Sequence, residues 1–212
     1  MELKGFIFDL DGVIVFTDQF HYKAWKTLAD EVGVYFDEKI NHRLRGVSRM
    51  ESLEIILERY HERKLSMQEK EILADKKNRI YRSLLDTMTP ADVTDEVRNT
   101  LAELRAKGYK LAIGSSSKNA RYILEKVKLT DAFDAISDGT NITKSKPDPE
   151  VFLKAAEFLN LAPEECMVVE DADAGIQAAK AGGMYAAGIG EAAMCPKADI
   201  ALSQFSELLK LI

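Results

Sequence analysis

Acidic and hydroxyl side chains follow three short apolar runs of this 212-residue chain, at the points where the runs end. Lys146 adds a positive charge in a loop where Pro147 and Pro149 restrict the backbone. If the runs are parallel strands, their carboxyl ends meet at one edge of a sheet, where ligands bind. We therefore expect these polar groups to converge. The runs and the residues after them are Leu3–Phe8 with Asp9 and Asp11, Leu111–Ile113 with Ser115, and Cys166–Val169 with Glu170 and Asp171.

This set of groups has the chemistry that phosphoryl transfer needs. Clustered carboxylates repel one another, and a hard cation such as Mg²⁺ relieves that repulsion through oxygen ligands. The Asp9 carboxylate can attack phosphorus to form an acyl phosphate, while Asp11 can protonate the leaving oxygen and later deprotonate the acceptor. Ser115 and backbone N–H groups at the start of the next helix can bind phosphoryl oxygens. Lys146 supplies positive charge where the transferring group becomes most negative.

Each motif taken singly has a plainer explanation. The Asp-x-Asp-Gly turn also occurs as an ordinary solvated turn, and the Glu170-Asp171 pair or the serine run can cap the helix that follows it. Lys146 alone can be a surface lysine. The common order, with each motif at a strand end, favours one shared site. The chain has no P-loop, which disfavours a kinase of that type, and Gly188-x-Gly190 lacks the rest of a dinucleotide motif.

Two kinds of pattern divide the chain. After Pro90, strand-like runs alternate with helical segments, which is typical of a parallel sheet with helices on both faces. Before Pro90, apolar residues recur at helical spacing, as in the segment from about Met67 to Leu85. The sequence therefore predicts an α/β fold. We expect a Rossmann-like parallel sheet core, residues 1–16 and 90–212, and an inserted α-helical cap, residues 17–89.

The composition limits the partners and the location. The formal net charge is −6, which argues against binding to nucleic acid or to an anionic membrane surface. Asp9 interrupts the first apolar run, which is too short for a signal peptide or a membrane span. Cys166 and Cys195 lack the spacing and the histidine neighbours of a zinc or redox site. We expect a cytoplasmic monomer that acts on a small molecule.

The acidic excess lies outside the predicted cap. Residues 17–89 contain 14 Lys and Arg against 13 Asp and Glu, whereas the rest of the chain contains 15 against 22. The three histidines and Trp25, the one tryptophan, also fall in 17–89. Two different kinds of structure therefore share this chain.

The motifs together resemble those of the haloacid dehalogenase superfamily of phosphotransferases. They are Asp9-Leu10-Asp11-Gly12-Val13, Ser115 after a strand, Lys146-Pro147, and Glu170-Asp171 followed by Ala174-Gly175-Ile176. The resemblance implies that Asp9 is the nucleophile and Asp11 the general acid and base. It implies that Ser115 and Lys146 bind the transferring phosphoryl group. The implied ligands of Mg²⁺ are Asp9, Asp171, Glu170 and the backbone carbonyl of Asp11.

Within that superfamily, the chain resembles the β-phosphoglucomutase family, which interconverts β-D-glucose 1-phosphate and D-glucose 6-phosphate through an aspartyl phosphate and a sugar bisphosphate. The shared elements are Thr17, His21 and Trp25, Arg45-Gly46-Val47-Ser48-Arg49, Lys77-Asn78, and Ser115-Ser116-Ser117-Lys118-Asn119. The resemblance implies that Arg49 binds the non-transferring phosphate. The other implied substrate-binding residues are His21, Trp25, Lys77, Ser117, Lys118 and Asn119. Thr17 would lie at the hinge, and His21 with Lys77 would couple sugar binding to cap closure.

The residues alone leave alternatives open. Lys77 lies on an otherwise apolar helix stripe, so it needs a partner or a function, unless it extends along the rim to solvent. His21 can be structural, and Arg49 can be a surface residue. Phe16 and Ala172 depart from the family, since relatives often have an aspartate and a serine there. The rival functions are a sugar-phosphate phosphatase of the same fold and, further away, a phospho-acceptor signalling domain without catalytic activity.

Overall fold

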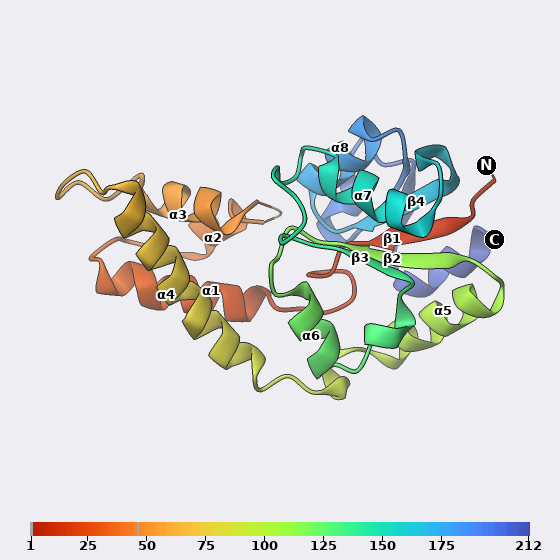
Figure 1. Ribbon diagram of the computed structural model, residues 1–212, viewed down its shortest axis with the longest axis horizontal. Helices are drawn as coiled ribbons and strands as arrows, with labels where there is room; N and C mark the ends of the chain where they lie inside the picture. The colour runs from red at the N-terminus through yellow and green to blue at the C-terminus, as the bar shows by residue number, and fades with distance from the viewer. Residues whose placement is uncertain (1, 46) are drawn as a thin grey trace.

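A computed structural model describes residues 2–45 and 47–212, so Gly46 of the predicted cap motif lies outside the described residues. The chain forms a sheet of six parallel strands in the order β3-β2-β1-β4-β5-β6. Helices α1 to α4 are inserted between β1 and β2, and they lie at the opposite end of the molecule from the sheet (Figure 1). The strands are β1 Gly5–Phe8, β2 Lys110–Gly114, β3 Ala135–Ser137, β4 Cys166–Glu170, β5 Tyr185–Ile189 and β6 Ile200–Leu202.

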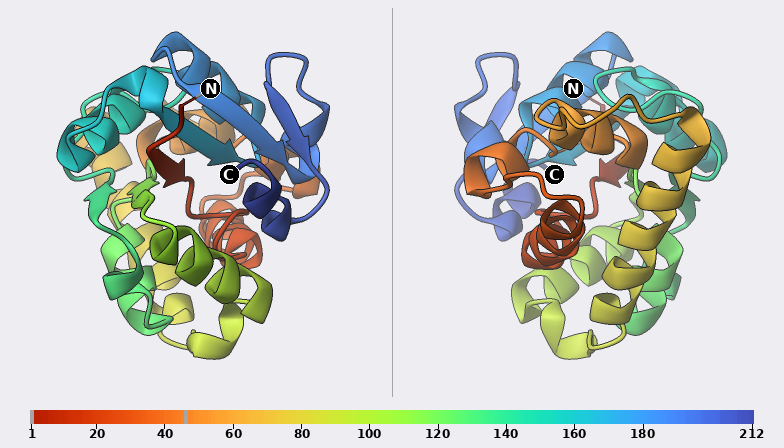
Figure 2. Two further views of the ribbon diagram at one scale, coloured as in Figure 1. Left: turned by 90° about the vertical axis from the view of Figure 1, so that its right-hand side faces the viewer. Right: turned by 90° about the vertical axis from the view of Figure 1, so that its left-hand side faces the viewer.

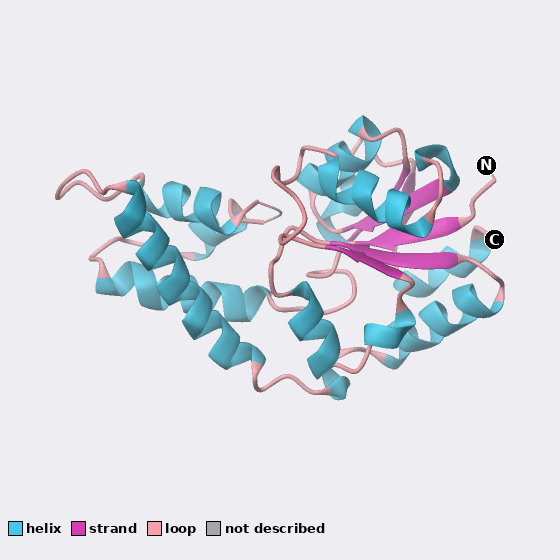
Figure 3. Cartoon of the chain, viewed as in Figure 1, coloured by secondary structure: helices cyan, strands magenta, loops and turns pink. Residues whose placement is uncertain are grey.

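The sheet is buried on both faces because each strand carries apolar side chains on both sides, as is usual in parallel sheets. Alternate residues of β1 serve different faces. Phe6 and Phe8 pack with α5, α6 and the C-terminal 3-10 segment Phe205–Lys210, whereas Ile7 packs with α7 and α8. Figures 1 and 3 show the sheet between these two helix layers. The core helices are α5 Asp95–Ala106, α6 Ala120–Lys126, α7 Glu150–Leu159 and α8 Asp173–Ala181.

The inserted helices have a hydrophobic cluster of their own, centred on Trp25, Leu28, Leu53 and Ile56. The N-termini of α3 and α4 are stabilised by local sequence, because Ser48 and Ser66 each form a capping box with the glutamate three residues later. The helices are α1 Asp18–Glu31, α2 Glu38–His42, α3 Arg49–Leu57 and α4 Met67–Leu85. The structure therefore confirms the predicted helical insertion, whereas its boundaries at residues 17 and 89 stay a prediction.

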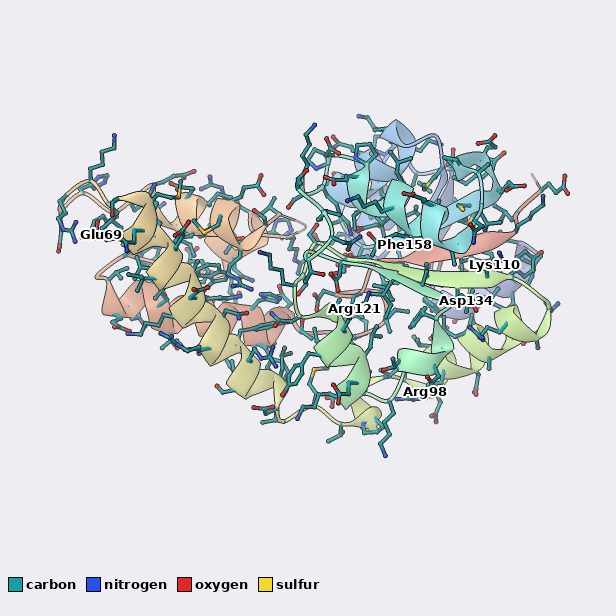
Figure 4. All side chains as sticks on the ribbon, in the orientation of Figure 1. Glu69, Arg98, Lys110, Arg121, Asp134 and Phe158 are labelled. Carbon is teal, nitrogen blue, oxygen red and sulfur yellow. The ribbon has the colours of Figure 1, made fainter. Side chains whose placement is uncertain are left out.

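The chain returns from the inserted helices to the sheet through a 3-10 turn, Pro90–Asp92, that is fixed to the core. Arg98 on α5, labelled in Figure 4, donates hydrogen bonds to the carbonyl oxygens of Pro90 at 2.7 Å and of Val127 at 2.8 Å. The exit from the cap is thereby tied to α5 and α6. Both views of Figure 2 show α4 and the core helix α6 on the same side of the molecule. Within the part of the chain that the structure describes, no helix combines the length and apolar character needed to span a bilayer.

Candidate active site

The polar residues that follow the strands meet at one edge of the sheet, as the sequence predicts. Asp9 follows β1, Ser115 follows β2, and Glu170 ends β4. Because β1 lies between β2 and β4 in the sheet, the ends of these three strands are direct neighbours. Asp9, Ser115 and Glu170 are all buried, with at most 8% of their surfaces exposed. The shared position of these residues supports a single reactive centre.

Lys146 is a buried lysine between two carboxylates. Its Nζ donates hydrogen bonds to Asp9 Oδ1 at 2.5 Å and to Glu170 Oε1 at 2.6 Å. Burial alone would lower the pKa of Lys146, but the charges and hydrogen bonds of Asp9 and Glu170 outweigh that effect and raise it. The lysine therefore carries a full positive charge at neutral pH. The surface-lysine alternative is wrong for this residue.

Asp9, Glu170 and Asp171 form an acidic cluster in which one carboxylate oxygen from each lies within 4.8 Å of the others. Burial, and then the negative charges of the neighbouring carboxylates, raise the pKa of Asp171 to about 8. Burial also raises the pKa of Glu170 to about 6, although the nearby Lys146 opposes the shift. The cluster is therefore short of positive charge despite the lysine, which is the electrostatic condition that favours a bound cation.

Two glycines leave the space that these carboxylates occupy. A Cβ atom at Gly12, where φ is +88°, would lie 2.1 Å from Asp171 Oδ2. A Cβ atom at Gly175 would lie 1.9 Å from the Glu170 carboxyl group. The Asp-x-Asp-Gly and Ala-Gly-Ile motifs thus include glycine because a larger residue would displace the acidic groups. The oxygen donors and this shaped space fit a hard divalent cation such as Mg²⁺.

Asp11 is held by residues from the cap side. Its carboxylate accepts a hydrogen bond from the Thr17 hydroxyl, which in turn accepts one from the Tyr81 hydroxyl at 3.1 Å. Burial, followed by the charge of Asp9, raises the pKa of Asp11 to about 7. A carboxyl group with this pKa can both give and take a proton near neutral pH.

The turn after β2 arranges its serines by hydrogen bonds to its own backbone. Ser115 Oγ accepts from the N–H of Ser117 at 3.2 Å, and Ser117 Oγ accepts from the N–H of Asn119 at 3.1 Å. The Asn119 side chain donates to Asn78 Oδ1 on α4 at 2.9 Å, so this turn contacts the cap directly. Lys118 is exposed between them. The serine run therefore does more than begin α6.

Lys77 on α4 is buried, with 3% of its surface exposed, and lies among aromatic rings. Its Nζ lies 2.9 Å from His21 Nδ1, 4.7 Å from the Trp25 ring centroid and 4.5 Å from that of Tyr81. Burial, together with the charge of Arg49, lowers the pKa of Lys77 to about 7. Burial also holds the pKa of His21 well below its usual value. The alternative in which Lys77 extends along the rim to solvent is wrong.

Arg49 begins α3 and is partly buried, which lowers its pKa from the usual value. Its Nη1 lies 3.6 Å from Asp75 Oδ1, whose own side chain is largely exposed. This contact is long and solvated, so it satisfies the guanidinium only weakly. Arg49 is therefore available to an anion that enters from the cavity.

A single cavity of about 910 Å³ joins the core groups to the cap groups. Thr17 is fully buried behind this lining. Phe16, the departure from the family at the hinge, lines the cavity and is 69% exposed. The predicted site residues that line it are Asp9, Asp11, His21, Trp25, Arg49, Lys77, Ser115, Ser117, Lys118, Asn119, Lys146, Glu170 and Asp171.

Several lining residues were not expected to act in the site. Tyr81 reaches Thr17 and stacks on His21 at a ring distance of 4.0 Å. Tyr81 could have been predicted from the sequence, because it follows Lys77 by four residues on the same helix and therefore lies on the same helix face. Arg45 and Glu191 line the opposite side and form an ion pair of 3.0 Å between cap and core. No sequence signal reports such a pair, because its members are 146 residues apart.

Comparison with known proteins identifies the class to which this site belongs. A family model described as haloacid dehalogenase-like hydrolase matches residues 3–183, most of the chain. The chain belongs to this family. The resemblance that the motifs predict is therefore confirmed, as is the α/β fold with its inserted helices.

Relatives within the family include mutases and phosphatases. The chain is 42% identical over 207 residues to β-phosphoglucomutase of Bacillus subtilis, covering 97% of this chain and 92% of the relative. It superimposes on the crystal structure of β-phosphoglucomutase from Clostridium difficile with a TM-score of 0.91 and 39% identity, covering 97% and 93% of the two chains. It is 30% identical to a phosphorylated carbohydrates phosphatase of Thermotoga maritima, covering 86% and 82%.

Proposed function

We propose that this protein is a Mg²⁺-dependent β-phosphoglucomutase, which interconverts β-D-glucose 1-phosphate and D-glucose 6-phosphate. The observation that carries the proposal is one cavity with cationic groups on both walls, above all Lys146 on the core wall and Arg49 on the cap wall. A phosphoryl-transfer centre needs only the first. The second suits a substrate that carries a phosphate at each end, as a sugar bisphosphate does. One chain supplies both walls, so we expect it to act as a monomer.

The acidic cluster fits Mg²⁺. Asp9, Glu170 and Asp171 would hold the ion, and the resemblance to the family adds the backbone carbonyl of Asp11. When bound, Mg²⁺ supplies positive charge that screens the carboxylate and phosphoryl oxygens from each other. Lys146 already holds Asp9 in place, so this carboxylate is oriented before substrate arrives.

The core residues perform the first transfer. Asp9 attacks phosphorus, the bond to the sugar oxygen breaks, and the phosphoryl group becomes an aspartyl phosphate. Lys146 and Ser115 bind the phosphoryl oxygens as their charge grows. Asp11, with a pKa of about 7, delivers a proton to the leaving sugar oxygen and later removes one from the accepting hydroxyl. The second transfer reverses these steps at the other end of the sugar.

The cap residues bind the sugar and its far phosphate. Arg49 presents a planar guanidinium that can bind a phosphate through two hydrogen bonds. His21 and Lys77 contact the sugar beside Trp25, and Ser117, Lys118 and Asn119 assist from the core turn. Closure of the cap over the substrate would exclude water, which otherwise hydrolyses the aspartyl phosphate. Thr17 would serve as the hinge, since it bonds to Asp11 on one side and to Tyr81 on the other.

Two assays run side by side test this function. The purified protein with Mg²⁺ receives β-D-glucose 1-phosphate and a trace of sugar bisphosphate, and both glucose 6-phosphate and inorganic phosphate are followed. We expect isomerisation to be much faster than phosphate release. Rapid phosphate release without isomerisation would instead establish a sugar-phosphate phosphatase. The Asp9→Ala variant should lose both reactions and also labelling by a phosphoryl donor.

The Arg49→Ala variant tests the far-phosphate site separately. Removal of a phosphate-binding arginine should reduce kcat/KM for glucose 1-phosphate by about a hundredfold, equivalent to about 2.7 kcal/mol. Labelling of Asp9 by acetyl phosphate should stay nearly unchanged, since that donor has no second phosphate. Arg43→Ala is the matched control, because Arg43 is an exposed cap arginine paired with Glu58 at 2.7 Å. Equal losses in both reactions would count against Arg49 as the far anchor.

A further inference from the structure

Glu191 joins the core to the cap at the edge of the cavity. It lies in the 3-10 turn Gly190–Met194, directly after β5. His42 Nε2, at the end of α2, lies 2.7 Å from Glu191 Oε2, and Arg45 Nη1 lies 3.0 Å from Glu191 Oε1. Arg45 also faces Asp18 of α1 at 3.7 Å. A single core carboxylate is thus held by two cap side chains.

A second polar contact lies on the other side of the reactive centre. Asn119, after β2, donates to Asn78 of α4. In the sheet order, β2 and β5 lie on opposite sides of β1 and β4. Asp9 directly follows β1, and Glu170 ends β4. Besides the bond from Thr17 to Asp11, the described residues thus include two polar contacts that join cap and core at the cavity wall, one on each side of the nucleophile.

The two contacts differ in kind. The asparagine pair is partly buried, so solvent competes with it less. His42 and Glu191 are both about 60% exposed. The ion pair between Glu191 and Arg45 is also open to solvent, and an exposed ion pair contributes little to overall stability. A cap that opens and closes on a hinge is a balance between two states, however, and a weak contact present in one state alone shifts that balance. Glu191 lies where such a contact acts on closure.

We propose that Glu191 is a positioning residue that holds the cap closed through His42 and Arg45 while the phosphoryl group is on Asp9. The kinetic part of this inference rests on the proposed mutase function, whereas the cap–core contact does not. The aspartyl phosphate has two fates. In transfer, the Asp9–phosphorus bond breaks and a sugar oxygen bonds to phosphorus. In hydrolysis the same Asp9–phosphorus bond breaks, but a water oxygen bonds to phosphorus. Asp11 takes the water proton, and inorganic phosphate leaves.

The contact itself is tested by distance measurement between spin labels on the cap and the core, at Lys64→Cys and Lys107→Cys, both exposed positions. Glu191→Gln keeps the size of the side chain and removes its charge. Glu58→Gln is the matched control, because it breaks an equally exposed pair with Arg43 that lies wholly within the cap. We expect longer and broader distances for Glu191→Gln alone. A distribution identical to that of the unsubstituted pair of labels would overturn the proposal.

The kinetic consequence has a separate readout. In Glu191→Gln, phosphate released per isomerisation and KM for glucose 1-phosphate should each rise about two- to fivefold, the factor that corresponds to loss of the exposed ion pair with Arg45. The melting temperature should stay within error of the unsubstituted protein. His42→Gln should act in the same direction but more weakly, because it leaves the contact of Glu191 with Arg45 in place. The double variant should add little to Glu191→Gln, which already alters both contacts. An unchanged partition between transfer and hydrolysis would contradict the kinetic role. If the unsubstituted protein does not isomerise glucose 1-phosphate, the proposed function fails while the distance measurement still decides the contact.

Discussion

Two buried lysines line opposite walls of one cavity, and their surroundings are opposite in charge. Lys146, on the core wall, bonds to the carboxylates of Asp9 and Glu170. Lys77, on the cap wall, lies beside His21 and aromatic rings, and among the described residues no carboxylate lies within 4.0 Å of its Nζ. The pKa of Lys146 is raised and that of Lys77 is lowered to about 7.

The difference shows which wall is complete before substrate binds. The core lysine has its negative partners within the protein, so it orders the nucleophile at all times. Among the described residues, neither Lys77 nor Arg49 has such a close pair of carboxylates: Arg49 contacts Asp75 only weakly, and the charge of Asp11 acts on Lys77 without a direct contact. An anionic sugar phosphate would supply the missing charge. The protein thus keeps a charge-balanced lysine where chemistry occurs and an unbalanced one where the substrate is to be recognised.

Of all substitutions on the two walls, loss of Lys146 should lower stability and activity the most. Lys146→Met leaves two buried carboxylates without their cation, which we expect to cost about 3–5 kcal/mol of stability. Loss of one charge-stabilising donor should also reduce kcat by about a hundred- to thousandfold. Urea unfolding and single-turnover labelling measure these two effects. Lys144→Met, in the same loop but 71% exposed, should change neither. A Lys146→Met protein that folds and reacts normally would show that the core wall does not depend on its lysine.

Removal of one acidic ligand tests the acidic cluster of the core wall. Asp171→Asn should weaken Mg²⁺ binding by roughly ten- to hundredfold, as measured by titration calorimetry. In the unsubstituted protein the affinity should rise between pH 6 and pH 8, because the pKa of Asp171 is about 8 and a proton competes with the ion below it. Asp173→Asn, an exposed neighbour at the start of α8, should leave both the affinity and its pH dependence unchanged.

Neutralisation of Lys77 tests the cap wall. Unlike loss of Lys146, which should lower stability, it should raise the stability of the folded protein. The pKa of Lys77 is lower in the folded state than the usual 10.5, so the unfolded chain binds more protons between pH 7 and pH 10.5. The free energy of unfolding should therefore rise with pH across this window, and Lys77→Met should remove that slope. At pH 7 the variant should be more stable by on the order of 2 kcal/mol, after allowance for lost cation–π contacts. Its affinity for sugar phosphate should fall.

Urea unfolding at pH 7 and pH 9.5 measures this effect. Lys76→Met is the matched control, since the neighbouring Lys76 is exposed and pairs with Glu31. Equal slopes in the Lys77→Met protein and the unsubstituted protein would contradict the assignment of the pH dependence to Lys77.

The positions of the core-wall residues could be predicted from the sequence, because the topology of the sheet determines where they lie. Asp9, Ser115 and Glu170 come directly after apolar runs, and parallel strands bring such positions together without reference to any other part of the chain. Lys77 was also detectable, because a charged residue on an apolar helix stripe must be explained. These signals are local, and the structure bears out the placement that they predict.

The missing parts depend on contacts between distant segments. The short helix α2, Glu38–His42, has little apolar periodicity and begins at an Asp37 cap that resembles an ordinary turn. The bond from Tyr81 to Thr17 joins residues 64 apart. The meeting of His42 and Arg45 with Glu191 needs the final orientation of the inserted helices on the sheet. Residue type and spacing carry no record of that orientation.

Gly175 shows how a position without a side chain can determine what the protein can become. A single added methyl group there would occupy the space of the Glu170 carboxyl group. Gly175→Ala would thus reach the reactive centre without altering any acid, base or lysine. Random mutagenesis for a new sugar specificity should accordingly find tolerant positions on the cap wall and almost none in the first turn of α8. The capacity of this enzyme to diversify lies in its inserted helices.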